Sequence, residues 1–111
     1  MKKLEWVGNS LKQLKKFPKL VQQEMGYALH VAQQGGAYRT VKRLKGYRGV
    51  YEIISDYQTD TYRVMYVLAV SDSIYVLHAF QKKSKKGIKT PKEEMNVIDE
   101  RLKLLKQRVL V

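Results

Sequence analysis

The first third of the chain carries apolar residues at helical spacing. A short strand is predicted at residues 3–7, and a first helix is predicted to begin with Ser10 as its N-cap. Pro18 interrupts the helical pattern, because proline disfavours helical geometry in the residue before it. A second helix is predicted from Pro18 to Gln34, where Gly35 follows as a stop signal. The two helices are expected to form a hairpin that covers a sheet.

The spacing of apolar residues changes to that of strands from Val50 onward. Runs rich in β-branched and aromatic residues cover 50–54, 61–70 and 74–80, with turn-forming residues between them. Strands this close together are expected to form an antiparallel meander, because a parallel crossover needs about a dozen connecting residues. The middle run is apolar on both faces and is therefore expected at the centre of the sheet. The stretch 37–49 contains two glycines and is expected to be an irregular, mobile connection.

The C-terminal region carries a clear helix-start signal. Thr90, Pro91 and Glu93 have the spacing of a capping box with proline at the first helical position. Apolar residues then recur every three or four positions, which predicts an amphipathic helix of roughly five turns. The predicted fold class is α+β, with an N-terminal helical hairpin packed on a small, mainly antiparallel sheet and a C-terminal helix. At 111 residues the chain is expected to form one domain, 1–111.

Composition points to a polyanionic partner. The chain has 22 Lys and Arg against 10 Asp and Glu, a net charge of +12, and such an excess favours RNA or DNA. It has no cysteine and only two histidines, so we expect no disulfide, no zinc site and no other metal or cofactor. No apolar run is long enough for a signal peptide or a membrane span, so we expect a soluble, cytoplasmic protein without a membrane partner.

The positive charge is concentrated in two segments that contain no acidic residue. One is the connection 37–49, and the other is 81–89, which holds five lysines between the last strand and the last helix. The segment 81–89 could be a solubilising surface, but its density of lysines and its position at the end of a sheet favour contacts with phosphates. Tyr47, beside the first cluster, is a candidate for stacking on a base.

Pairing of the last two strands determines which side chains share a face. A two-residue loop at 71–72 pairs Arg63, Met65 and Val67 with Phe80, His78 and Val76, respectively. A three-residue loop would reverse that parity.

Arg63 is unusual because it lies within an otherwise apolar strand. A charged side chain that faces a covered core needs a partner. Arg63 therefore either faces a functional groove or pairs structurally with Glu52, Asp56 or a helix carboxylate. For His78, a packed or hydrogen-bonded core position is the alternative to a direct role.

No familiar catalytic spacing is present: the sequence has no glycine-rich phosphate loop, nucleophile elbow, paired-histidine motif or acidic metal cluster. An enzyme built from this chain would work mainly with cations. RNA cleavage by the substrate's own 2′-hydroxyl tolerates this, because the protein need only align the attack and stabilise the phosphorane charge. A lysine could act as the base if neighbouring cations lower its pKa.

Several segments together resemble a known family. The chain resembles the phage-derived HigB-like branch of the RelE/ParE toxin superfamily over nearly its whole length. The segment 75–83 is the most specific part of the resemblance. The supporting segments are 43–46, 50–53, 61–64 and 89–91.

The resemblance implies a RelE-like fold and a toxin of a type II toxin–antitoxin pair. Its implied activity is metal-independent, ribosome-dependent mRNA cleavage in the decoding site, and its implied partners are the ribosome, mRNA and a HigA-like helix-turn-helix antitoxin. The resemblance matches Arg63, Lys82, Lys83 and Lys45 to basic positions of the family. The candidate catalytic residues are Arg63, Lys82, Lys83 and His78. The candidate RNA-binding residues are Arg43, Lys45, Arg48, Gln81, Lys85, Lys86 and Lys89.

The sequence departs from some relatives at its C-terminus. It has a long helix where they carry a short tail with an aromatic residue near the reactive phosphate, so the general acid is unassigned. Because fold alone does not fix function, two alternatives stay open. One is a ParE-like toxin that inhibits gyrase, and the other is a non-catalytic basic nucleic-acid-binding protein of phage origin.

Overall fold

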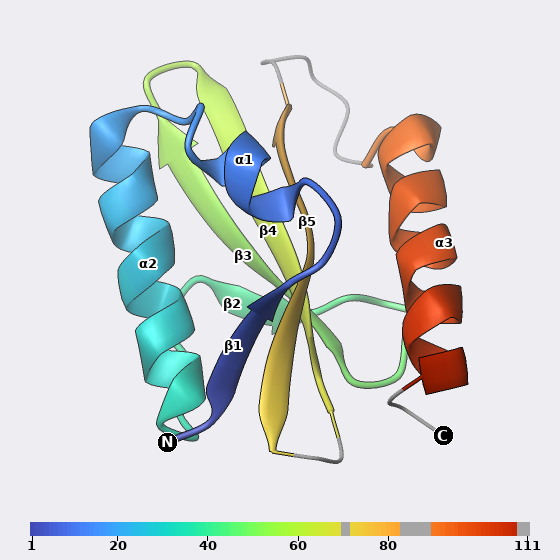
Figure 1. The fold of residues 1–111 in the computed structure, drawn as a ribbon. Coiled ribbons are helices and arrows are strands. Elements are labelled where there is room, and N and C mark those ends of the chain that lie inside the picture. Colours follow the sequence, from blue (N-terminus) through green and yellow to red (C-terminus); the bar gives the residue numbers. More distant parts are fainter. Residues whose placement is uncertain (70–71, 83–89, 109–111) are drawn as a thin grey trace.

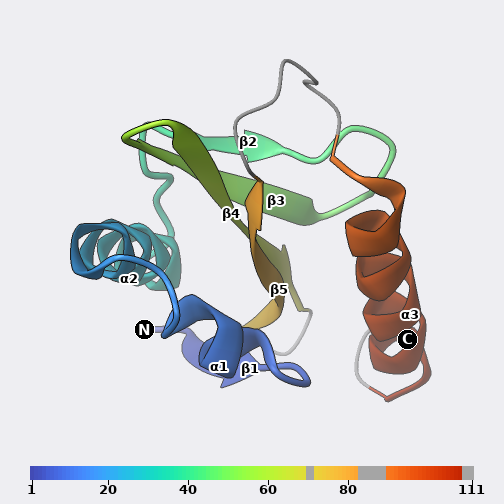
Figure 2. The same ribbon diagram turned by 90° about the horizontal axis from the view of Figure 1, so that it is seen from above.

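A five-stranded sheet lies between helices on its two faces (Figures 1 and 2). The computed structural model describes residues 1–69, 72–82 and 90–108. The helices are α1 Ser10–Leu14, α2 Lys19–Gln33 and α3 Lys92–Arg108. The strands are β1 Lys3–Trp6, β2 Val41–Arg43, β3 Val50–Tyr57, β4 Asp60–Leu68 and β5 Ser73–Lys82. The α+β prediction is confirmed.

The predicted meander forms the main part of the sheet. The strand order is β1-β5-β4-β3-β2, and β3, β4 and β5 pair antiparallel in succession. The strand β4 lies at the centre, as its apolar character on both faces predicts. The first strand, β1, pairs parallel with β5, so the sheet is mainly antiparallel.

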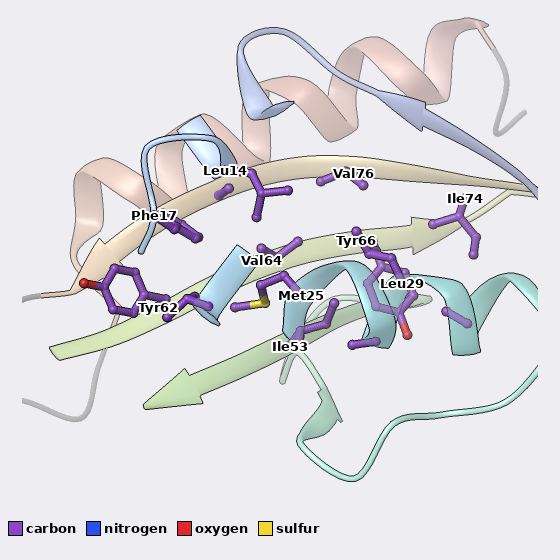
Figure 3. Close-up of a cluster of buried hydrophobic side chains, with 14 residues drawn as sticks. Leu14, Phe17, Met25, Leu29, Ile53, Tyr62, Val64, Tyr66, Ile74 and Val76 are labelled. Atoms are coloured by element: carbon purple, nitrogen blue, oxygen red, sulfur yellow. The ribbon is translucent and has the colours of Figure 1, made fainter. Parts of the chain in front are cut away.

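One face of the sheet, here called the α2 face, packs against α1 and α2. Met25 and Leu29 of α2 are fully buried there against Ile53 of β3 and Val64 of β4 (Figure 3). Apolar residues of α2 recur at spacings of three and four, so the helix presents one apolar stripe to the sheet.

The opposite face, here called the α3 face, packs against the C-terminal helix. Ile98, Leu102 and Leu105 of α3 are buried against a second cluster from the sheet. That cluster contains Val50, Met65, Val67, Leu77 and Phe80. In the part of the chain that the structure describes, no helix is long and apolar enough to cross a membrane.

Two local predictions are wrong. The connection 37–49 contains a regular strand, β2, which pairs antiparallel with β3. Three residues are too few for a strand pattern, and basic side chains are common on short edge strands, where they discourage pairing with other chains. Ser10 is not the N-cap of α1; Asn9 takes that position, and the Ser10 hydroxyl donates to the Val76 carbonyl oxygen at 3.2 Å.

The predicted pairing of β4 with β5 is only partly right. Arg63 pairs with Phe80 and Met65 with His78 as predicted, but Val67 pairs with Tyr75 rather than Val76. A β-bulge between these two stretches accounts for the difference, because it adds one residue to β5.

Candidate nucleic-acid site

The candidate site lies on the α3 face, toward the end of the sheet where α3 begins. Thr61, Arg63 and Met65 of β4 pair with Lys82, Phe80 and His78 of β5, so these six side chains share that face. Glu52 of β3 joins them, because it pairs with Met65. The predicted grouping of Arg63, His78 and Lys82 is therefore present.

Arg63 is held by a carboxylate from the neighbouring strand. Its Nη1 donates a hydrogen bond to Glu52 Oε2 at 2.9 Å, and the two side chains are only 13% and 9% exposed. The pairing with Glu52 is one of the two alternatives that the sequence left open. Among the described residues, Arg63 Nε has no hydrogen-bond partner. This donor therefore makes no hydrogen bond within residues 1–69, 72–82 and 90–108.

Lys82 lies beside this ion pair at the end of β5. Burial lowers the pKa of Lys82 below its usual value, and the neighbouring charge of Arg63 lowers it further, whereas Glu52 opposes the change. Lys82 therefore loses its proton at a lower pH than an ordinary lysine does. The sequence-based hypothesis of a lysine base requires a shift in this direction.

His78 has a different environment from the two cations. Its side chain is 8% exposed, its ring stacks on Phe80, and its Nε2 lies 2.6 Å from Glu94 Oε1 at the start of α3. Its Nδ1 is buried and has no partner within the described residues. This geometry ties β5 to α3, and a direct catalytic role for His78 stays a prediction.

The basic residues of the connection before β3 fall into two groups. Arg43 pairs with Tyr51, whose ring packs in the α2-face cluster, so it lies on the face opposite Arg63. Lys45 and Arg48 are exposed in the loop between β2 and β3. Lys42, which the sequence did not single out, pairs with Glu52 and so points to the Arg63 side. Only the register of β2 could have revealed Lys42, and its strand signal is too short.

The loop between β2 and β3 reaches across the α3 face to the helix. Tyr47 donates a hydrogen bond to Asp99 of α3 at 2.6 Å, and this hydrogen bond raises the pKa of Tyr47, with smaller effects from burial and from the Asp99 charge. A groove of about 890 Å³ lies between the loop and α3, with Arg48 among its lining residues. Because its hydroxyl is held by Asp99, Tyr47 is fixed in place beside the two exposed cations.

The remaining predicted residues lie at or beyond the end of β5. Gln81 is exposed, pairs with Tyr62 and donates to Asp60 Oδ2 at 2.6 Å, so it does not share the Arg63 face. Lys83, Lys85, Lys86 and Lys89 lie outside the described residues. Across 1–69, 72–82 and 90–108, no three His, Cys, Asp or Glu side chains are grouped to hold a metal ion.

Comparison with solved structures shows a RelE-type fold for this small basic α+β protein. The isolated RelE toxin of Escherichia coli superposes with a TM-score of 0.62 at 17% identity, covering 95% of this chain and 99% of RelE. A chain of the E. coli RelBE toxin–antitoxin complex gives a TM-score of 0.60 at 17% identity, covering 78% of this chain and 100% of that one.

The sequence places the chain in a family. The profile of the phage-derived Gp49-like proteins (DUF891) matches residues 12–103, and the chain belongs to this family. No curated protein sequence matches the chain significantly. The RelE-like fold and the phage-derived family are confirmed, whereas the toxin role and the narrower HigB assignment stay predictions.

Proposed function

We propose that the protein is the toxin of a type II toxin–antitoxin pair and cleaves mRNA on the ribosome. One observation carries the proposal: Arg63, anchored by Glu52, shares a sheet face with Lys82, whose pKa is lowered. The RelE-type fold and the net charge of +12 support it. The fold alone would not support this activity, because the same fold hosts different activities.

The proposed reaction is a transfer of the phosphodiester within the RNA. The 2′-oxygen attacks the adjacent phosphorus, the bond from phosphorus to the 5′-oxygen breaks, and the products are a 2′,3′-cyclic phosphate and a 5′-hydroxyl. Neutral Lys82 accepts the proton of the 2′-hydroxyl and later releases it to solvent, while water protonates the leaving 5′-oxygen. Alignment and charge stabilisation are the main requirements of this chemistry, which fits a site built from cations.

Arg63 is the proposed stabiliser of the developing phosphorane. The Glu52 carboxylate fixes one arm of the guanidinium, so little rearrangement is needed when the charge appears. Lys83 is a proposed second cation next to Lys82. Lys45 and Arg48, with Lys85, Lys86 and Lys89, are proposed to bind RNA phosphates, and such contacts weaken as salt rises.

The proposed partners are the ribosome, its mRNA and a neutralising antitoxin. The E. coli RelBE structure is a complex of a toxin with its antitoxin, and a similar partner is proposed here. The antitoxin is proposed to be a small helix-turn-helix protein of the HigA type. A reading frame of that kind next to the gene would support this assignment.

Induced expression followed by mapping of mRNA 5′ ends tests the proposal. We expect growth arrest with new 5′ ends within translated codons, in frame with the message. We also expect free RNA to stay mostly intact without ribosomes. Intact mRNA with stalled replication would instead indicate a gyrase-directed toxin. Growth without new 5′ ends and RNA binding without cleavage would indicate a non-catalytic binding protein.

A further inference from the structure

The strand β5 changes its register on β4 partway along the hairpin. Near the turn, Val67 pairs with Tyr75 and Tyr66 with Val76, whereas beyond the bulge Met65 pairs with His78. Leu77 is the extra residue, and its side chain packs in the same α3-face cluster as Phe80. Both Leu77 and His78 thus face α3, although they are adjacent in sequence.

The bulge determines which β5 residues face Arg63. If the register near the turn continued without it, Arg63 would pair with Ala79 instead of Phe80. Because side chains alternate along a strand, a shift by one residue exchanges the two faces. Phe80 and Lys82 would then lie on the α2 face. The site on the α3 face therefore exists only while the bulge is kept.

The bulge leaves a backbone group that needs a partner. Leu77 is fully buried and has no register partner on β4, and β1 ends at Trp6, opposite Val76. A buried carbonyl without a hydrogen bond is costly. Arg101 of α3 supplies the bond, since its Nη1 donates to the Leu77 carbonyl oxygen at 2.7 Å.

The guanidinium of Arg101 is itself held in place by the turn between β1 and α1. Its Nη2 donates to Asn9 Oδ1 at 2.7 Å. Gly8 has a φ of +57°, and a Cβ there would lie 2.7 Å from Arg101 Nη2, too close for an ordinary contact. Only glycine therefore leaves room for this guanidinium. The same two hydrogen bonds connect α3, β5 and the 8–9 turn.

We propose that Arg101 is a positioning residue for the sheet-face site. By capping the Leu77 carbonyl it stabilises the bulge, and the bulge keeps Phe80 and Lys82 on the face of Arg63. Its effect on cleavage rests on the proposed nuclease function, whereas its effect on the register does not. Arg101 itself does not touch RNA.

Four variants separate this role from a general structural one. Arg101→Ala removes the hydrogen-bond donor of the Leu77 carbonyl. Gly8→Ala keeps Arg101 but displaces its guanidinium. Lys103→Ala, at an exposed position of α3, is the control for Arg101→Ala, because it also removes one positive charge from α3. Gly35→Ala is the control for Gly8→Ala. Gly35 has a φ of +90°, so alanine there is also strained, but an added Cβ would meet no other atom. If Arg101→Ala does not fold, Arg101→Lys takes its place beside Gly8→Ala.

The first measurement is an NMR titration of the Lys82 side chain together with the cross-strand contacts of Phe80. We expect the Lys82 pKa to rise toward its usual value and the Arg63–Phe80 contacts to weaken in Arg101→Ala and Gly8→Ala. Both controls should match the wild type. Unchanged Lys82 titration and unchanged contacts in Arg101→Ala or Gly8→Ala would overturn the proposal, even if the unfolding midpoint falls. This measurement decides the role of Arg101 whether or not the protein cleaves RNA.

The second measurement is cleavage of ribosome-bound mRNA. We expect kcat to fall at least about tenfold with KM unchanged in Arg101→Ala and Gly8→Ala, because misplacing a reacting group slows the chemical step. Added guanidinium, far below denaturing concentrations, should restore part of kcat in Arg101→Ala and none in Gly8→Ala. A wild-type kcat in Arg101→Ala would contradict the positioning role in catalysis.

Discussion

Arg63 and Glu52 form an ion pair of 2.9 Å across neighbouring strands, and the two charges act in opposite directions on Lys82. Burial lowers the pKa of Lys82, Arg63 lowers it further, and Glu52 raises it. The anion thus serves two purposes: it compensates the buried guanidinium and limits the loss of charge on Lys82. Without Glu52, Arg63 would lack the carboxylate that holds it, and the pKa of Lys82 would be lower still.

Replacing Glu52 tests this balance. In Glu52→Gln the buried Arg63 loses its countercharge, so we expect a loss of about 2–4 kcal/mol in the free energy of unfolding. The Lys82 pKa should fall below its wild-type value, because the charge that raised it is gone. Urea unfolding and an NMR titration of Lys82 measure the two effects. Glu5→Gln, at an exposed position of β1, is the control, and a rise of the Lys82 pKa in Glu52→Gln would contradict the account.

The pH dependence of cleavage should report the ionisation of Lys82. Because its neutral form is the proposed base, the single-turnover rate should rise with pH and level off at the Lys82 pKa, below the usual 10.5. Lys82→Arg keeps the positive charge but has no neutral form in this range. We expect it to lower the rate about 100-fold or more and to remove the pH-dependent rise. A wild-type rate and profile in Lys82→Arg would mean that Lys82 acts only as a cation.

The helices α2 and α3 and the meander could be predicted from the sequence because each spans several periods of its pattern. The strand β2 could not, since three residues hold no recognisable alternation. The apolar residues of α2 and β4 also indicated which sides are covered. In a helix or strand of this length, the spacing of the apolar residues is enough to show which side is buried.

The site was only partly predictable for a different reason. The pairing of Arg63 with Phe80 followed from an assumed two-residue turn, yet the observed register near the turn is shifted by one residue. The bulge at Leu77 corrects the shift, so the prediction was right at Arg63 and wrong at Val67. A bulge depends on tertiary partners such as Arg101, which no local pattern reveals. Glu94, the partner of His78, was hidden for the same reason.

The contact between His78 and Glu94 should stabilise the start of α3. In Glu94→Ala the nearly buried His78 Nε2 loses its partner, so we expect a loss of about 1–2 kcal/mol in unfolding free energy. Amide hydrogen exchange should quicken in the first turns of α3. Glu93→Ala removes an exposed carboxylate of the same helix turn and is the matched control. Equal exchange in the two variants would show that the contact contributes nothing.

The hydrogen bond from Tyr47 to Asp99 should hold the loop between β2 and β3. In Tyr47→Phe we expect a loss of about 0.5–1 kcal/mol at neutral pH. The folded-state pKa of Tyr47 is raised above 10, so its contribution is complete below pH 10 and is lost as pH rises through the folded value. The difference between variant and wild type should therefore shrink in alkaline urea titrations. Tyr27→Phe, on the exposed side of α2, is the control, and a pH-independent difference would refute the assignment.

The most direct test of the account is single-turnover cleavage of ribosome-bound mRNA by purified protein. Arg63→Ala and Lys82→Ala are compared with the wild type and with Lys19→Ala, an exposed lysine at the start of α2, on the other side of the sheet. Circular dichroism confirms that each variant is folded. We predict that Arg63→Ala and Lys82→Ala each lower the rate about 100-fold or more, while Lys19→Ala leaves it unchanged. Wild-type rates in both site variants would contradict the claim that these two cations carry the reaction.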